Sequence, residues 1–350
     1  MAEHFEVAII GAGPAGIGAA TNAAHNKISH ILFEKGEIAN TIYDYQLRKH
    51  VMAEPSKLPL RARCRFEEGS REKILEEFIA DLKTHSVNLV QAEVTKISKA
   101  GDNFEIHYQG KVCTAQHVVL SIGVQGSPRK LGVPGEESSH VAYTLADPDE
   151  FKQRHIIVVG AGDAAIENAL ALSVNNTVSL INRGGEFARA KEANSKLILS
   201  AVQAGKIQCY YNATVARIDP DKTTVNTPDG EVAIPCEHII ARLGCVLPRK
   251  FLESIGIEFP SEEATAVPAV SGRYESNVPG LFILGALIGY PLIKQAINQG
   301  YEVIEHIRGV AVEPADQPLL EERFENIPGG FKENFSKVSQ GLPLFKDLTV

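Results

Sequence analysis

The sequence lacks the features that mark disulfide-stabilised, zinc-binding or nucleic-acid-binding chains. Its 5 cysteines are scattered without a C-x-x-C pair, so neither a disulfide framework nor a zinc site is indicated and reduced thiols are expected. The 11 histidines show no spacing typical of metal ligands. A net charge of −8, with no basic stretch interleaved with aromatic residues, argues against nucleic acid as a partner.

Apolar runs long enough to cross a membrane are also missing. Val118–Ile122 and Leu281–Leu287 have the length of strands. The first expected strand begins by about residue 6, which leaves no room for a signal peptide, so we expect a cytoplasmic protein. A chain of 350 residues, 44% hydrophobic and with 29 glycines, suits two or three α/β domains.

The N-terminal segment predicts a dinucleotide-binding site. Val7–Ile10 is a short apolar run typical of a buried parallel strand, and Gly11, Gly13 and Gly16 follow in G-x-G-x-x-G spacing. The first glycine permits a tight turn, the second lets a pyrophosphate approach the backbone, and the third lets the helix pack close to the sheet. Pro14 suits the first turn of that helix, where its missing N–H is not needed.

An acidic residue completes this first unit. The next apolar strand, His30–Phe33, ends in Glu34, which lies 23 residues after Gly11. A carboxylate at this place accepts hydrogen bonds from a ribose. Strand, glycine motif, helix, strand and terminal acid together predict an FAD site.

The same pattern returns 149 residues later. Ile156–Val159 precedes Gly160, Gly162 and Ala165 in G-x-G-x-x-A spacing, followed by an alanine-rich helix and a strand. Arg183 holds the place that Glu34 has in the first unit. Because an arginine accepts a 2′-phosphate where an acid selects a bare ribose, this second site favours NADPH, with NADH possible.

Helices and strands between the motifs follow from apolar periodicity. Helices are expected over Ser70–Lys83, Lys191–Ala204 and Pro291–Ile307; strands over Leu89–Tyr108, Lys111–Ser121, Val178–Ile181, Ile207–Ile218, Thr223–Ile234, His238–Ala241 and the end of Val278–Gly285. Residues 35–69 are expected to be irregular, with tyrosines that pack over a ring system or on the surface.

These motifs resemble the low-molecular-weight thioredoxin reductase-like flavoproteins, which are NAD(P)/FAD-dependent pyridine nucleotide oxidoreductases. Five blocks occur in family order over roughly residues 5–310. They are GAGPAG at 11–16, SIG at 121–123, GAGDAA at 160–165, VPGLFILGA at 278–286 and YPLIKQAINQG at 290–300.

The resemblance implies an α/β fold with two Rossmann-like three-layer ββα domains, the NAD(P) domain being inserted into the FAD domain. The FAD domain takes residues 1–123 and 249–312, the NAD(P)H domain 124–248, and 313–350 form a linker or extension. Expected FAD contacts are Gly11, Gly13, Pro14, Ala15, Gly16, Glu34, Lys35, Asn40, Gly123, Gly285, Ala286, Gln295 and Ala296. Expected NADPH contacts are Gly160, Gly162, Asp163, Ala164, Ala165, Asn182, Arg183 and Arg189. The resemblance also implies a homodimer formed through the FAD domains.

Three departures from the family pattern bear on function. Thioredoxin reductases carry C-x-x-C before an aspartate that lies 13 residues ahead of the second glycine motif; here Asp147 is kept, but Tyr143 to Ala146 hold no cysteine. Related reductases of small disulfides carry a cysteine where this chain has Ala15. Without either thiol, a dithiol relay to a disulfide has no chemical basis. The position after the late glycine is usually acidic in the family, but in this chain it is Ala286. Loss of the acid is expected to lower FAD affinity unless Asn40 or Tyr43 compensates.

The family's basic cluster for the 2′-phosphate is partly present. Arg183 and Arg189 remain, with Lys191 beyond, while Asn182 and Gly184 occupy positions that are often basic. The alternative, solvated charges ahead of a helix, stays open.

Hydride transfer from the nicotinamide to the flavin is the expected chemistry. The helix that begins near Ile293–Gln295 should stabilise negative charge on the reduced flavin through its N-terminal dipole. Asp147 is a candidate proton donor, or alternatively the N-cap of a helix before Glu150–Gln153. Three electron acceptors are considered: a protein carrier such as ferredoxin or a cytochrome, a small oxidant such as a quinone, oxygen or a disulfide, and none, if the chain is a flavin-based redox sensor.

The C-terminus falls outside the resemblance. Residues 311–325 are rich in proline and acids, which predicts a linker. The end, from Leu342 to Leu348, resembles the opening of a cyclic-nucleotide-binding domain; the alternative is a tail whose Phe335, Leu344 and Phe345 pack on the core or cover the flavin.

Overall fold

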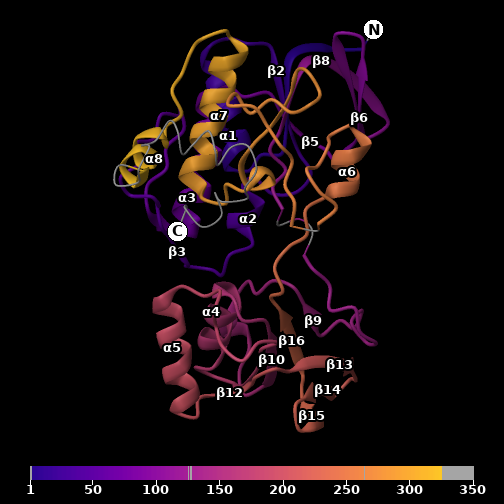
Figure 1. Ribbon diagram of the computed structural model, residues 1–350, viewed down its shortest axis with the longest axis vertical. Coiled ribbons are helices and arrows are strands. Elements are labelled where there is room, and N and C mark those ends of the chain that lie inside the picture. The colour runs from indigo at the N-terminus through magenta and orange to yellow at the C-terminus, as the bar shows by residue number, and fades with distance from the viewer. Residues whose placement is uncertain (1, 125, 127, 264, 325–350) are drawn as a thin grey trace. The chain divides into compact units, whose positions relative to one another are not determined.

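The computed structural model describes residues 2–124, 126, 128–263 and 265–324, which form two compact units (Figure 1). Among the described residues, the first unit combines the chain up to Tyr43 with Arg48–Gly126 and the chain from Leu247 to Phe324. The second combines Asp44–Leu47 with Ser127–Val246. The second unit thus interrupts the first, which confirms the predicted insertion of one domain into another.

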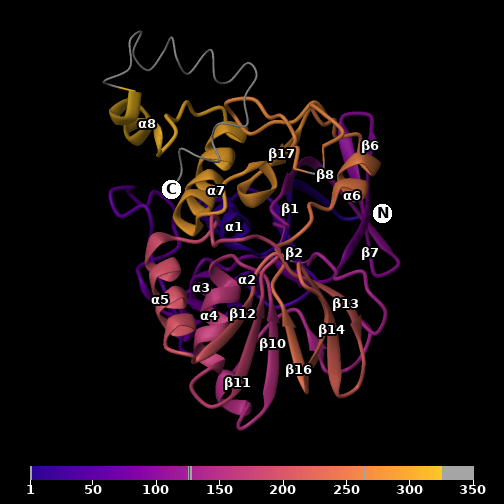
Figure 2. The same cartoon turned by 60° about the horizontal axis from the view of Figure 1, so that its bottom comes forward.

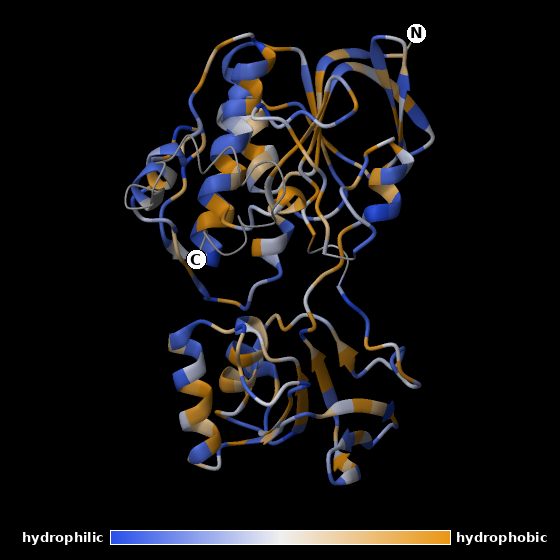
Figure 3. Cartoon of the chain, in the orientation of Figure 1, coloured by the Kyte–Doolittle hydropathy of each residue, from blue (hydrophilic) through white to orange (hydrophobic). Residues whose placement is uncertain are grey.

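A seven-stranded sheet organises the first unit, and strand β8 links its two parts. The strands are β1 (His4–Ile10), β2 (His30–Glu34), β5 (Leu89–Gln91), β6 (Val94–Ala100), β7 (Asn103–Tyr108), β8 (Lys111–Leu120) and β17 (Leu281–Ile283). The first half of β8 pairs antiparallel with β7, and its second half pairs parallel with β1 and β17. The order β5-β2-β1-β8 places the carboxyl ends of four parallel strands at one edge. Buried residues fill most of β1, β2 and β17, as expected for parallel strands that are covered on both faces. Over the whole unit the hydropathy colours are mixed on helices and strands alike (Figure 3).

Helices α1 (Pro14–His25) and α7 (Ile293–Ile307) run side by side in the first unit (Figure 1). Two glycines make this contact close. A Cβ atom on Gly18 would lie 2.4 Å from the carbonyl oxygen of Ile297, and one on Gly300 would lie 2.1 Å from that of Ala15. The Asn22 amide then donates to Glu305 Oε1 at 2.9 Å. Because neither glycine can carry a side chain here, the two backbones approach and hold α7 against the glycine-motif helix.

The segment after β2 is less irregular than expected. It contains α2 (Asn40–Tyr43) and a small ladder of β3 (His50–Val51) with β4 (Gly69–Ser70). Helix α3 (Arg71–Thr84) follows, capped by the Ser70 side chain, which accepts from the Lys73 N–H; this confirms the helix predicted from Ser70.

The second unit has three layers: a pair of helices, a parallel sheet and an antiparallel sheet (Figure 2). The parallel sheet is β12 (Ile207–Tyr210), β11 (Thr177–Ile181), β10 (His155–Val159), β16 (His238–Ala241) and β9 (Val141–Ala142). Ile156 and Val158 of β10 pack into the core that holds α4 (Asp163–Leu172) and α5 (Glu192–Gln203). Ile157 and Val159 pack instead against the antiparallel sheet of β13 (Thr214–Ile218), β14 (Lys222–Thr227) and β15 (Gly230–Pro235). Successive side chains of β10 therefore point to opposite faces of the parallel sheet, one covered by the helices and the other by the antiparallel sheet.

The remaining elements are short. They are the 3-10 turns η1 (Pro148–Glu150) and η2 (Gly285–Ile288), and helices α6 (Arg249–Ser254) and α8 (Gln317–Phe324). Helix α8 lies in the stretch expected to be a linker; Pro314 and Asp316 accept the N–H groups of Gln317 and Leu319 at its start. The predicted motifs beyond residue 324 lie outside the described residues. No helix within the described ranges has the length and hydropathy required of a membrane span.

Candidate functional site

The three glycines of the first motif face different surroundings. Gly11 has φ +102°, and a Cβ on it would lie 2.7 Å from the Ser121 carbonyl oxygen. A Cβ on Gly16 would lie 1.9 Å from the Gly11 oxygen. A Cβ on Gly13 would lie 3.6 Å from the Ser121 carbonyl oxygen, an ordinary van der Waals contact, and Gly13 has a φ of −74°. The fold therefore requires glycine at 11 and 16, whereas the missing side chain of Gly13 leaves space that the protein itself does not fill.

The N-terminus of α1 lies next to that space. Gly13 is the N-cap of α1 and supplies no side-chain hydrogen bond, so the first N–H groups of the helix have no partner within it. Glu34 at the end of β2 accepts the Ala12 N–H at 2.7 Å and the Gly36 N–H at 2.9 Å. The predicted ribose acceptor thus also holds the glycine turn. An uncapped helix N-terminus beside an open backbone fits the diphosphate of a dinucleotide.

Other predicted contacts on this side lie where the chain is exposed or at a strand end. Lys35 pairs with Glu93 at 3.6 Å, with both side chains exposed. Asn40 accepts the Glu37 N–H at 3.3 Å. Gly123 follows β8 and has a φ of +60°, and a Cβ on it would have no other atom within 4 Å.

Three motifs that are distant in sequence meet beside the first helical turn. A Cβ on Gly285 would lie 3.6 Å from the Ala296 Cβ and 3.7 Å from the Ala15 Cβ. The Gly285 N–H donates to Gln299 Oε1 at 2.7 Å, which ties η2 to α7. The predicted contacts Ala15, Gly285 and Ala296 are therefore brought to one place, where their small size lets the three segments pack closely.

The N-terminal turn of α7 also leaves a polar atom unpaired. Gln295 is 6% exposed, and its Oε1 has no hydrogen-bond partner among the described residues. Lys294 beside it donates to the Pro55 carbonyl oxygen at 3.0 Å. A buried acceptor without a partner is costly, and a bound group with a donor would satisfy it. The residues present therefore fit a flavin nucleotide.

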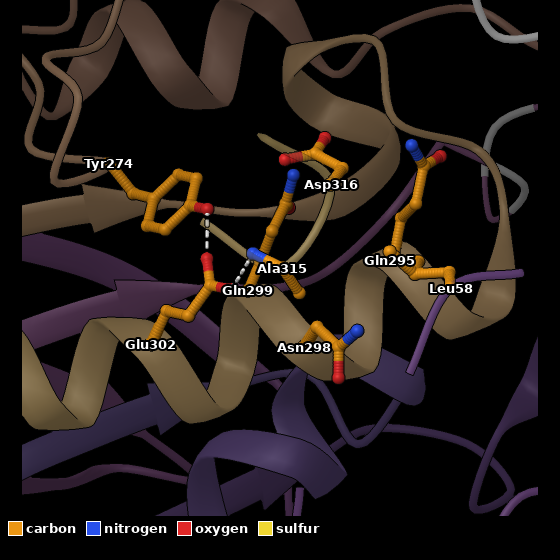
Figure 4. A pocket seen from close by; sticks show the side chains of 8 residues that line it. All are labelled: Leu58, Tyr274, Gln295, Asn298, Gln299, Glu302, Ala315 and Asp316. Atoms are coloured by element: carbon orange, nitrogen blue, oxygen red, sulfur yellow. Dashed lines mark hydrogen bonds between the residues drawn. The ribbon is translucent and has the colours of Figure 1, made fainter. Parts of the chain in front are cut away.

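A buried carboxylate cluster further along α7 was missed from the sequence. Glu302 is 2% exposed and accepts the Tyr274 hydroxyl and the Ala315 N–H (Figure 4). It also lies 3.9 Å from the Arg61 guanidinium. Burial raises the pKa of Glu302 to about 7, against the two hydrogen bonds, which lower it. Burial also raises the pKa of Asp316, which lines the same small cavity. The partners of Glu302 come from three separate segments, so no local pattern could have indicated the cluster.

The second glycine motif resembles the first: a Cβ is excluded at its first glycine but not at its second. Gly160 has φ +134°, and its Cβ would lie 2.3 Å from the Arg242 carbonyl oxygen and 3.2 Å from the Ala165 Cβ. Gly162, the N-cap of α4, has φ −88°, no side-chain cap and nothing within 4 Å. Asp163 and Ala164 follow as the first helical residues, so this N-terminus is open to an anion as well.

The loop after β11 carries the predicted selectivity residues. Arg183, Arg189 and Lys191 are exposed. Asn182 is buried, and its side chain bonds within the loop. The exposed guanidinium groups are available to an anion, whereas Asn182 points into the protein.

Asp147 acts as a cap. Its side chain accepts the Asp149 N–H at 3.0 Å at the start of η1, which begins two residues before the helix expected at Glu150–Gln153. This supports the alternative to the proton-donor role.

All five cysteines are free thiols, and burial is the largest cause that raises each pKa. The pKa rises to about 12 for Cys64 and to about 11 for Cys113 and Cys209. A thiol held in its protonated form is a poor nucleophile, so none of the five has the character of a redox-active cysteine.

Comparison with known proteins agrees with this architecture. The family model described as pyridine nucleotide-disulphide oxidoreductase matches residues 8–285. A ferredoxin--NADP reductase of Ignicoccus hospitalis is 27% identical over 310 residues, covering 84% of this chain and 93% of the relative. The bacilliredoxin reductase Bdr of Bacillus subtilis is 26% identical over 288 residues, covering 80% and 88%.

Solved structures share the fold. The bacillithiol disulfide reductase Bdr (YpdA) of Staphylococcus aureus superposes with a TM-score of 0.80 at 22% identity, covering 88% of this chain and 99% of that one. The thioredoxin reductase of Lactococcus lactis gives a TM-score of 0.73 at 23% identity, covering 87% and 98%. Both are similar to this chain in their two Rossmann-like domains.

Proposed function

This chain belongs to the pyridine nucleotide-disulphide oxidoreductase family, and we propose that it passes a hydride from NADPH to FAD and then electrons to a protein carrier. It is an NAD(P)H-dependent flavoprotein oxidoreductase with FAD and NADPH as cofactors. The observation that carries the proposal is the pair of open glycine caps, Gly13 and Gly162, each at the start of a helix behind a parallel strand. When bound, the flavin accepts the hydride and releases electrons singly or in pairs.

In the first unit, we assign FAD to residues 1–123 and 249–312. The α1 amides and the Gly13 backbone would hold the diphosphate, and Glu34 the ribose. Gln295 would donate or accept at the ring system, and the α7 N-terminus would stabilise negative charge there. The small residues Ala15, Gly285 and Ala296 leave room for the chain between ring and diphosphate.

In the second unit, we assign NADPH to residues 124–248. The α4 amides would hold its diphosphate beside Gly160, Gly162 and Ala165. Arg183 and Arg189 would contact the 2′-phosphate, since both guanidinium groups are exposed.

The choice between a protein carrier and a disulfide as electron acceptor depends on whether the chain has a redox-active thiol. The Ignicoccus relative is named for ferredoxin, which supports a protein carrier, and the Bacillus relative is named for bacilliredoxin, which supports a disulfide. The five cysteines lie at neither glycine cap and have raised pKa values, so the carrier is the better fit. We further propose a homodimer through the FAD domains and a cytoplasmic location.

The test is anaerobic stopped-flow reduction of the flavin by NADPH and by NADH, followed by mixing with acceptors. Fast reduction by NADPH and fast reoxidation by a ferredoxin or a cytochrome would support the proposal. Faster reoxidation by a quinone, oxygen or a disulfide would reassign the acceptor. Slow reduction accompanied by a conformational change would favour a redox sensor instead.

A further inference from the structure

The loop that joins β11 to α5 carries both arginines assigned to the 2′-phosphate, and its ends are held by side chains. One anchor in the middle is apolar: Phe187 is buried and packs on the Tyr211 ring at 5.9 Å between centroids. The loop also has two consecutive glycines, Gly184 and Gly185. Because glycine gives the backbone the most freedom, the position of Arg183 depends on what restrains its neighbours.

Asn182 restrains the first end. Its Oδ1 accepts the Gly184 N–H at 2.8 Å, and its Nδ2 donates to the Glu186 carbonyl oxygen at 3.0 Å. Its own backbone is tied to the core, since its N–H donates to Tyr210 and its oxygen accepts from Ala213. The Asn182 residue is 1% exposed, whereas its partners Gly184 and Glu186 lie on the exposed part of the loop. The side chain therefore closes a turn around Arg183 while the guanidinium group stays outside.

Asp163 restrains the second end. Its Oδ1 accepts the Lys191 N–H at 2.9 Å and the Asn194 Nδ2 at 2.7 Å. Asp163 is the first residue of α4, directly after the glycine cap. The loop segment that carries Arg189 is thus fastened to the helix whose N-terminus faces the dinucleotide.

We propose that Asn182 and Asp163 are positioning residues for cofactor selectivity: they hold the arginine loop so that Arg183 and Arg189 meet the 2′-phosphate, and they do not themselves contact it. The inference rests on the proposed preference for NADPH. It assigns discrimination to two residues that bond to the loop: Asn182 through both polar atoms of its amide, and Asp163 through its Oδ1. The motifs had indicated direct cofactor contacts for both.

The test measures the affinity of the full-length holoenzyme for two probes, 2′,5′-ADP and 5′-AMP, by titration calorimetry. Asn182→Ala and Asp163→Ala should each lower the preference for 2′,5′-ADP over 5′-AMP about tenfold, the loss of one charge-assisted contact. Asn182→Ala should also leave 5′-AMP affinity unchanged. Asp163→Asn keeps an oxygen acceptor for both donors and should retain the preference. Arg183→Ala serves as the reference for a lost phosphate contact.

A matched control comes from the same unit. The Asn176 side chain donates to the carbonyl oxygens of Phe151 and Leu172 and accepts the Arg154 N–H, so like Asn182 it bonds backbone groups of neighbouring loops, with three bonds against two. Asn176→Ala should lower thermal stability about as much as Asn182→Ala but leave the preference intact. If Asn182→Ala does not fold, the Asp163→Ala and Asp163→Asn pair still decides.

Each outcome is distinct. An unchanged preference in both alanine variants, with a lowered one in Arg183→Ala, would overturn the positioning roles and keep the NADPH assignment. Equal weakening of both probes would also overturn them, since it would reveal a merely structural role. No preference in the wild type would refute the NADPH assignment itself, and the positioning roles with it.

Discussion

The contrast between Gly13 and Gly16 separates cofactor binding from folding. At Gly13 an added Cβ meets only Ser121 at 3.6 Å, and φ of −74° is open to any residue. Gly13→Ala should therefore change the stability of the FAD-free protein by less than about 1 kcal/mol, the range of N-cap replacements. At Gly16 an added Cβ would lie 1.9 Å from the Gly11 oxygen, so α1 must shift. Gly16→Ala should destabilise the protein by about 1–3 kcal/mol or more.

FAD affinity responds differently. The Cβ and methyls of Gly13→Val would fill the space in which the diphosphate approaches, and the same overpacking range of about 1–3 kcal/mol corresponds to roughly 5- to 150-fold in Kd. Thermal unfolding of FAD-free samples and fluorescence titration with FAD measure the two effects separately. Full yellow flavin absorbance in purified Gly13→Val would refute the reasoning. So would a loss of stability in FAD-free Gly13→Ala as large as that of Gly16→Ala.

Three further outcomes are expected. Replacing both Arg183 and Arg189 by alanine should reduce the discrimination between NADPH and NADH by several kcal/mol, about 1.5–3 for each charged contact, and an unchanged ratio of kcat/KM values would contradict the assignment. Since Tyr143 and Ala146 replace the cysteines of the family motif, thioredoxin-coupled disulfide reduction at about 1–10³ per second should be absent in an NADPH oxidation assay. The pKa of Glu302, raised by burial to about 7, means that the folded protein binds this proton more tightly than the unfolded chain. That stabilisation, up to about 3 kcal/mol, is complete below pH 4 and lost as pH rises through 7; Glu302→Gln should flatten this slope in Tm measured from pH 5 to 8, and an identical slope would exclude it.

The sequence by itself determined both dinucleotide-binding units. Each glycine motif specifies its turn within six residues, because Gly11 and Gly160 adopt positive φ and Gly16 and Ala165 admit the helix. The strands before the motifs were predicted because a parallel strand buried on both faces needs a continuous apolar run. These features are local, so spacing alone was sufficient.

Only the tertiary structure decided what the polar residues do. Asn182 occupies a cofactor position in the motif but turns inward, because the carbonyl oxygen of Glu186 and the N–H of Gly184 lie within its reach. Gly18 and Gly300 are far apart in sequence, and their joint role appears only where α1 meets α7. Glu302 has a raised pKa because segments from residues 61, 274 and 315 bury it. Contacts across such separations leave no period or spacing in the chain, since they depend on which faces the fold brings together.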